Sequence, residues 1–294
     1  MAPGALAQVL GDLPNVHNDN LLVGFDTSDD ASVFRVGDNL GLVQSIDFFP
    51  PMVDDPFLFG QIAAANSLSD IYAMGGRPSH AMNLLCIPSC LASRSQVRFW
   101  RVAPTSASRL AAPSRAPHHQ RRRAKYGLSV SGFVALDRML ANSGARVGDV
   151  LLLTKAIGSG IITTAIKGVL IEQDEAAAMF DSMRTLNEAP IRLAEGLELH
   201  GCTDITGFGL IGHACEMAEG SGVQIELVSG AVPLFDRCST WRVWALSPRL
   251  LPQPGLLWPA CGRRRGPGAG CVGCAVRSTD IGWPAYRGAR GGCG

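Results

Sequence analysis

Three short stretches near the N-terminus have the pattern of β-strands. Residues 21–25 form an apolar run that ends in a polar, acidic cluster at 26–30, as expected for a strand that leads into a loop. Residues 31–36 alternate between apolar and polar positions, and a Gly-Asp-Asn turn separates them from a further run at 40–46. We therefore predict three strands, with Asp47 at the end of the third.

The segment 57–74 has the spacing of an α-helix. Apolar or small residues recur at positions 59, 62, 63, 68, 71 and 74, and two glycines end the pattern. Asn66 and Asp70 are four residues apart, so they share one face of this helix. Two polar groups on one side of an otherwise apolar helix make it a candidate for a functional site, with Asn66 as a supporting residue or a packing contact.

The second half of the chain alternates between strand and helix patterns. We predict strands at 125–134, 150–154 and 223–228, and helices at 163–170, 174–183, 188–197 and 210–219. The Gly-rich loop 202–209 leads into the last of these helices. This alternation predicts an α/β fold class (α+β-like) with mixed sheets.

Length and composition narrow the class of protein. The chain has 294 residues, of which 47% are hydrophobic and 17% charged, so it could bury a large core, and two domains suit it better than one. It contains neither a run of eighteen apolar residues nor a signal-peptide pattern, so we expect no membrane contact and a cytoplasmic location. The nine cysteines are then expected to be reduced thiols.

The charge is distributed in bands of opposite sign. Residues 1–90 carry ten Asp against two Arg, and 128–230 carry thirteen acidic against six basic residues. Residues 91–127 carry nine Lys or Arg and no acidic residue, and 231–294 carry nine Arg against two Asp. All five Trp lie in the two basic bands. The chain therefore consists of two acidic segments of ordinary composition and two unusual basic ones.

The acidic residues suggest a metal-assisted phosphate site. Several Asp lie at strand ends, on the helix face or in the Gly-rich loop, namely Asp29, Asp30, Asp47, Asp70 and Asp204. Mg²⁺ prefers oxygen ligands and is held by a few carboxylates together with substrate phosphates. Any one of these residues could instead serve a turn or a helix cap, because Asp is common there.

The residues around these acids resemble a known family. The stretches at 27–31, 45–49, 64–76 and 203–213 together are similar to selenophosphate synthetase (selenide, water dikinase), of the aminoimidazole ribonucleotide synthetase-like superfamily. The resemblance covers residues 5–91 and 125–235 in the family's order. It implies ATP-dependent conversion of selenide and water to selenophosphate, AMP and phosphate.

The resemblance also implies a site and a fold. Asp30, Asp70 and Asp204 would bind Mg²⁺ on the ATP phosphates, and Thr27, Ser28, Asp29, Asp47 and Asp70 would line the nucleotide site. His213 would be a helix residue near a cap. The fold would have an N-terminal ATP-binding domain at 1–135, which dimerises by building a shared β-barrel, and a truncated C-terminal α/β domain at 146–235. The resemblance further implies that an intact member of the family is a homodimer and that its substrates are ATP and selenide.

The sequence departs from the family in three places. No catalytic residue can be assigned, because the family's nucleophilic Cys or selenocysteine and its Lys would lie upstream of Met1. Residues 91–124 replace the family's Gly-Gly-His loop. Back-translated and read one base later, 117–124 yield the family's His-Thr-x-x-Asp-x-Glu sequence, so we expect a frameshift there. A second frameshift explains 236–294, which we expect to be disordered.

These departures leave the activity of the chain open. We expect a weak or inert selenophosphate synthetase. The alternatives are another ATP-using enzyme of the same superfamily and a non-catalytic remnant that binds nucleotide or nucleic acid. Binding of nucleic acid is disfavoured, because the Arg-rich band 91–124 contains one Trp and no recognisable RNA-binding motif. The Cys271–Cys274 pair has no second pair at the spacing of a zinc site.

Overall fold

The computed structural model describes residues 18–24, 29–86, 124–194, 196–236 and 238, and the backbone of two short strands at 111–112 and 275–277. Thr27, Ser28, most of the segment 91–124 and most of the segment 236–294 lie outside the described residues. The predictions made for those positions are therefore not addressed by the structure.

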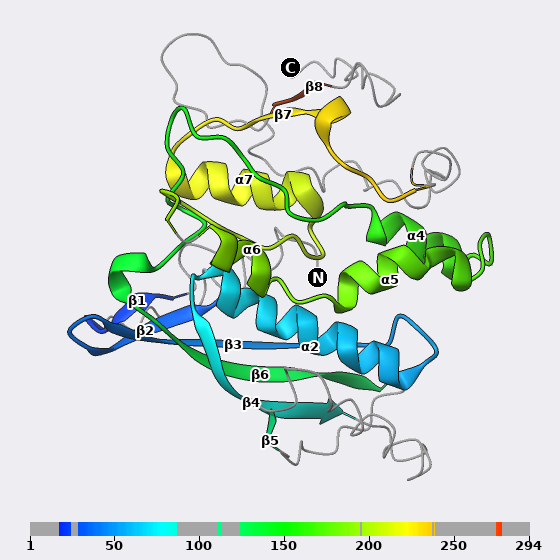
Figure 1. The fold of residues 1–294 in the computed structure, drawn as a ribbon, viewed down its shortest axis with the longest axis horizontal. Coiled ribbons are helices and arrows are strands. Elements are labelled where there is room, and N and C mark those ends of the chain that lie inside the picture. Colours follow the sequence, from blue (N-terminus) through cyan, green and yellow to red (C-terminus); the bar gives the residue numbers. More distant parts are fainter. Residues whose placement is uncertain are drawn as a thin grey trace, which may run out of the picture.

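A six-stranded sheet forms the base of the molecule (Figure 1). Its strands are β1 (Leu21–Val23), β2 (Ser32–Gly37), β3 (Leu40–Phe49), β4 (Arg77–Cys86), β5 (Ala111–Ala112) and β6 (Lys125–Val134). Their order is β1-β2-β3-β6-β4-β5, and every pair is antiparallel except β4 and β5. The predicted strands at 21–25, 31–36, 40–46 and 125–134 are all present, and β4 is an additional strand.

Helix α2 (Pro56–Ala73) covers one face of this sheet. Asp55 caps its first turn by accepting hydrogen bonds from the backbone N–H groups of Phe57 and Leu58, and Pro56 fits the first turn because it has no N–H to satisfy. Val43, Leu128 and Val130 point from β3 and β6 towards the helix and are fully buried. The predicted helix 57–74 is thus confirmed to within one residue at each end.

The helices that follow lie above α2 and the sheet (Figure 1). They are α4 (Ser159–Lys167), α5 (Ala177–Arg184), α6 (Glu188–Leu193) and α7 (Gly209–Ser221), with short 3-10 turns at Leu136–Arg138, Asp174–Ala176 and Ser229–Ala231. Helices α5 and α6 contact α2 directly. The main apolar core therefore continues from the sheet through α2 into α4 and α5.

Four predicted elements of the second half differ in the structure, and one of them, the helix predicted at 163–170, is α4 at Ser159–Lys167. Residues 150–154 form no strand, because no strand lies beside them among the described residues to complete a hydrogen-bonded ladder. The predicted strand 223–228 is shortened to β7 (Glu226–Val228), which pairs with β8 (Ala275–Arg277). The predicted helix 188–197 ends at Leu193 as α6. None of the helices described is long and apolar enough to cross a membrane.

Candidate functional site

The first half of the site forms where α2 packs on β3. Residues 45 and 47 alternate with the outward-facing residues of β3 and therefore point towards the helix. The amide of Asn66 donates to Asp47 Oδ2 at 2.6 Å, and the hydroxyl of Ser45 donates to Asp70 Oδ2. Asn66 and Asp70, which were predicted to share one face of the helix, therefore both contact side chains of β3.

The second half is the loop 202–209, which packs against the start of β2. The hydroxyl of Thr203 donates to Asp30 Oδ1 at 3.0 Å, and Ser69 of α2 forms a hydrogen bond with Asp204. The backbone N–H of Cys202 donates to Ala141 O at 3.1 Å, which ties the loop to the chain after β6. Segments more than 170 residues apart in sequence therefore meet in one place.

Four carboxyl groups meet at this point, of which Asp70 is buried and the other three are partly buried. Burial, then the charge of Asp204, raises the pKa of Asp30 to about 7 and that of Asp70 to about 9. Burial is also the main cause that raises the pKa values of Asp47 and Asp204. Burial, helped by repulsion between the carboxylates, therefore disfavours their ionised forms, and a bound cation would offset this cost.

The arrangement fits a hydrated Mg²⁺ better than a closed metal centre. No group of three or more His, Cys, Asp or Glu side chains in the described ranges is arranged to hold a metal ion by itself. Asp30 Oδ2, however, is buried and has no hydrogen-bond partner. Because Mg²⁺ usually keeps several waters and uses only one or two carboxylates plus substrate phosphates, a loose cluster with an unsatisfied oxygen suits it.

Asp29 and His213 have partners of their own. Asp29 Oδ1 accepts a hydrogen bond from the backbone N–H of Asn142 at 2.7 Å, so it fastens the chain after β6. His213 is buried in α7, where Nε2 lies 3.2 Å from the backbone nitrogen of Thr206, which donates to it, and Nδ1 lies 3.0 Å from Glu216. These contacts agree with the expectation that His213 is a helix residue near a cap. A nucleotide-binding role for Asp29 stays a prediction.

Cys202 is the described cysteine next to the acidic cluster, but it is a poor nucleophile in this setting. Burial and the nearby charges of Asp30 and Asp204 raise the pKa of its thiol to about 12. The reactive form of cysteine is the thiolate, which is then scarce at neutral pH.

Sequence reasoning missed three hydroxyl residues that support the carboxylates, Ser45, Ser69 and Thr203. Each lies within two positions of a predicted Asp. Ser45 and Asp47 share a face of their strand because side chains alternate, and this period could have marked Ser45 in advance. For Ser69 and Thr203 no periodic signal exists, since their partners come from distant segments.

Comparison with known proteins identifies the class of the fold. Residues 28–104 match the family described as AIR synthase related protein, N-terminal domain, and residues 146–248 match its C-terminal domain. Among solved structures, one titled "AaThiL complexed with AMPPCP and TMP" superposes with a TM-score of 0.66 at 18% identity, covering 83% of this chain and 78% of that one. The protein therefore has the AIR synthase-related fold, which confirms the predicted fold class.

Curated relatives narrow the family. A selenide, water dikinase of Clostridium botulinum (strain Eklund 17B / Type B) is 48% identical over 246 residues, covering 80% of this chain and 69% of the relative. A second, from Caldanaerobacter subterraneus subsp. tengcongensis, is 41% identical over 267 residues, covering 90% of this chain and 74% of the relative. The chain belongs to the selenide, water dikinase family, which confirms the resemblance noted in its sequence.

Proposed function

We propose that this chain catalyses the ATP-dependent synthesis of selenophosphate from selenide and water, with AMP and phosphate as the other products. Both anhydride bonds of ATP break in this reaction, so that one phosphoryl group is transferred to selenium and another to water. The observation that carries the proposal is the partly buried cluster of Asp30, Asp47, Asp70 and Asp204 in a member of the selenide, water dikinase family.

The cluster fits phosphoryl transfer, which depends on positioning and on neutralising charge rather than on covalent chemistry by the protein. Together with the phosphates of ATP, Asp30, Asp70 and Asp204 would supply the oxygen ligands of Mg²⁺, each ion using one or two of these carboxylates, and the metal when bound would neutralise the phosphate oxygens. Ser45, Ser69 and Thr203 keep these carboxylates oriented through hydrogen bonds. Asn66 holds Asp47 through a hydrogen bond, and Asp47 and Asp70 would line the nucleotide site together with Thr27, Ser28 and Asp29.

The reaction can be followed directly by ³¹P NMR with ATP, Mg²⁺ and selenide. We expect slow, selenide-dependent formation of AMP and selenophosphate, and its loss in Asp204→Asn. Asp38→Asn is a matched control, because Asp38 is an exposed carboxylate in the turn between β2 and β3. Absence of selenide-dependent AMP would contradict the activity, and absence of ATP binding in equilibrium dialysis would contradict the site itself.

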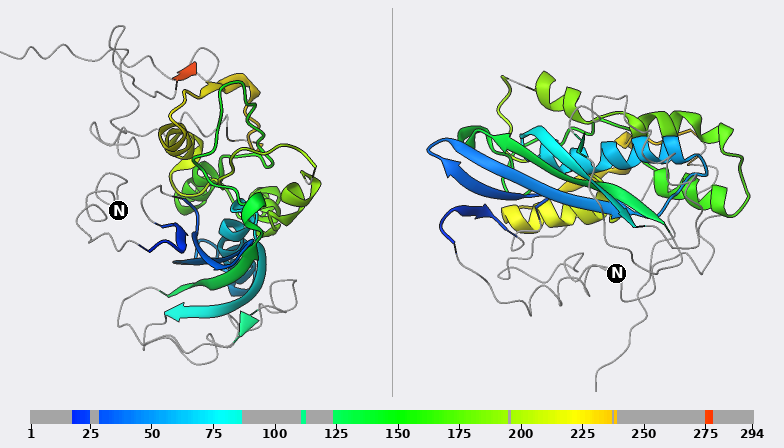
Figure 2. Two further views of the ribbon diagram at one scale, coloured as in Figure 1. Left: turned by 90° about the vertical axis from the view of Figure 1, so that its left-hand side faces the viewer. Right: turned by 90° about the horizontal axis from the view of Figure 1, so that it is seen from below.

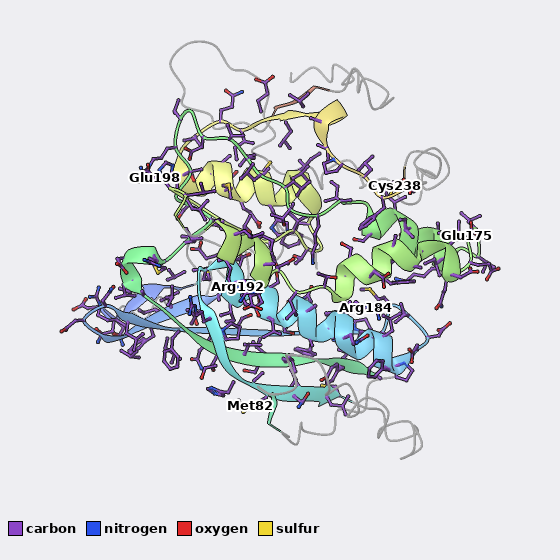
Figure 3. The ribbon with its side chains drawn as sticks, in the orientation of Figure 1. Met82, Glu175, Arg184, Arg192, Glu198 and Cys238 are labelled. Atoms are coloured by element: carbon purple, nitrogen blue, oxygen red, sulfur yellow. The ribbon has the colours of Figure 1, made fainter. Side chains whose placement is uncertain are left out.

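We also propose that the chain forms a homodimer through the face of the sheet that α2 leaves open. Large apolar side chains of four strands are exposed on this face, namely Phe34, Ile46, Phe48, Met82 and Phe133. Met82 projects from β4 away from α2 (Figure 3), and in the views of Figure 2 the helices gather on the opposite side of the sheet. Contiguous exposed apolar surface of this kind usually marks an interface.

A cytoplasmic location is part of the same proposal. Among the described residues, Cys86, Cys202, Cys215 and Cys238 form no disulfide with one another. Reduced thiols are the usual state of cysteine in the cytosol.

A further inference from the structure

Asn187 stands at the start of α6 but does not act as a helix cap. Asparagine at this position usually accepts a hydrogen bond from the first turn of its own helix. Here the side chain makes no capping hydrogen bond, and Nδ2 instead donates to Ser69 Oγ on α2 at 2.8 Å. The ordinary structural explanation for an asparagine at a helix start therefore does not apply.

The contact continues to the acidic cluster. Ser69 is 2% exposed, and its hydroxyl is hydrogen-bonded to Asp204. When Asp204 is ionised, as a metal ligand must be, its carboxylate can only accept, so the hydroxyl of Ser69 uses its single proton on Asp204. The oxygen of Ser69 is then left to accept, which requires that the NH₂ group and not the carbonyl of Asn187 faces it. The hydrogen bonds run in one direction, from Asn187 through Ser69 to Asp204.

This direction has a consequence for Asp204. A serine hydroxyl can rotate and could donate to other acceptors, such as a backbone carbonyl of its own helix. The NH₂ group of Asn187 donates to the oxygen of Ser69. This hydrogen bond favours the orientation of the Ser69 hydroxyl in which its proton points at Asp204. The remaining oxygen of Asn187, Oδ1, is buried without a hydrogen-bond partner among the described residues, so the amide is held in place by its bond to Ser69.

We propose that Asn187 is a positioning residue that orients Asp204 for Mg²⁺ through Ser69. The inference rests on the proposed function, since it assumes that Asp204 is a metal ligand. Residues that orient metal ligands from behind typically change metal affinity 10- to 100-fold when they are removed. Asn187 reaches the site from α6, which packs against α2 but supplies none of the carboxylates.

The test measures Mn²⁺ binding to the full chain by electron paramagnetic resonance, with Mn²⁺ alone as the probe. Asn187→Leu keeps a side chain branched at Cγ, at a somewhat larger volume, and removes the donor, and we expect it to raise the dissociation constant about tenfold. Ser69→Ala should have a similar effect, and the double variant should bind no more weakly than the weaker-binding single variant, because both act on one path. Gln173→Leu is the control, since Gln173 also bridges the helices to the α2 region, through Asp54, without touching the cluster.

The possible results of the Mn²⁺ measurement separate the role of Asn187 from the existence of the metal site. Unchanged Mn²⁺ affinity in Asn187→Leu, or fully additive effects of the two substitutions, would overturn the inference while leaving the metal site standing. Failure of the unsubstituted chain to bind Mn²⁺ would remove the proposed metal site and this inference with it. Near-ultraviolet circular dichroism checks the fold, and if the leucine variant unfolds, Asn187→Ala decides by the same measurement without steric strain.

Discussion

His200 lies at the surface between two carboxylates, away from the acidic cluster. Its Nε2 is 3.0 Å from Glu198 Oε1 and its Nδ1 is 2.8 Å from Asp149 Oδ1. The hydrogen bond with Glu198, followed by that with Asp149, raises the pKa of the imidazole above 6.5. The protonated ring therefore favours the folded state. Its contribution is fully present below about pH 6.5 and disappears as the pH rises through the folded pKa.

We expect Glu198→Gln to lower the pKa of His200 towards its ordinary value. The substitution removes the largest cause of the shift while keeping the shape of the side chain. Two-dimensional NMR titration of the imidazole would measure the pKa, and thermal unfolding at pH 5.5 and pH 9 would measure the linked stability. The variant should lose stability at pH 5.5 by more than at pH 9. An equal loss at both pH values would show that the charge of His200 is not involved.

At the scale of single residues, the sequence could mark the four carboxylates of the proposed site but not every residue that supports them. Asp30, Asp47, Asp70 and Asp204 could be singled out from the sequence, because their flanking residues resemble a family. Asn187 could not, since an asparagine before a helix reads as a cap. Only its contact with Ser69, 118 positions away, separates the two interpretations.

At the scale of elements, the pairing of β3 with β6 decides where Asp47 lies. Gly127 sits opposite Phe48 in this pairing, and a Cβ atom placed on it would lie 1.8 Å from the backbone oxygen of Asp47. The two backbones can approach this closely only because residue 127 has no side chain. The glycine thus determines the spacing of the strands next to a site residue.

Gly127→Ala should destabilise the protein strongly, by more than about 3 kcal/mol, because backbone atoms rather than a flexible side chain must move. Chemical denaturation would measure the free energy of unfolding. Gly160→Ala is the matched control. Nothing lies within 4 Å of the position that its new methyl group would take, and alanine stabilises a helix such as α4 by about 0.5–1 kcal/mol relative to glycine. A soluble Gly127→Ala variant of normal stability would show that β3 and β6 can shift without cost.

The correct and the incorrect predictions differ in whether the element depends on its own sequence or on a neighbouring strand. Helix α2 carries its own signals, namely the apolar spacing, the cap at Asp55 and the terminal glycines, and it was predicted to within one residue at each end. Residues 150–154 are apolar enough for a strand, but a strand also needs a neighbour. Conversely, β4 begins with Arg-Pro and is held in place by its ladder with β6.

For the whole molecule, the apolar face of the sheet opposite α2 predicts that two copies of the chain associate. Ile46 is 60% exposed in the middle of this face, although it belongs to a central strand. Burying such residues is favourable by roughly 25 cal/mol per Å² of apolar surface. A second copy that covers the face would remove several of these side chains from water at once.

Ile46→Lys should convert the dimer to a monomer, because the lysine ammonium group would have to be buried without a partner. Sedimentation velocity measures the distribution of species over a range of protein concentrations. Leu193→Lys serves as the control, since Leu193 is 84% exposed at the end of α6, a helix that lies on the α2 side of the sheet (Figure 1). A monomeric unsubstituted chain, or a dimer that survives Ile46→Lys, would contradict the proposed interface.

The sequence by itself determined the family, the fold class and helix α2, and it marked the acidic residues proposed for the site. All of these depend on local spacing and on short motifs. The tertiary structure decided which distant groups meet. Asp30 contacts Thr203, Ser69 contacts Asp204, and Asn187 contacts Ser69, across separations that no local pattern encodes. The physical reason is that burial and hydrogen-bond direction, which set the charge state of each carboxylate, arise only when the sheet, α2 and the loop 202–209 come together.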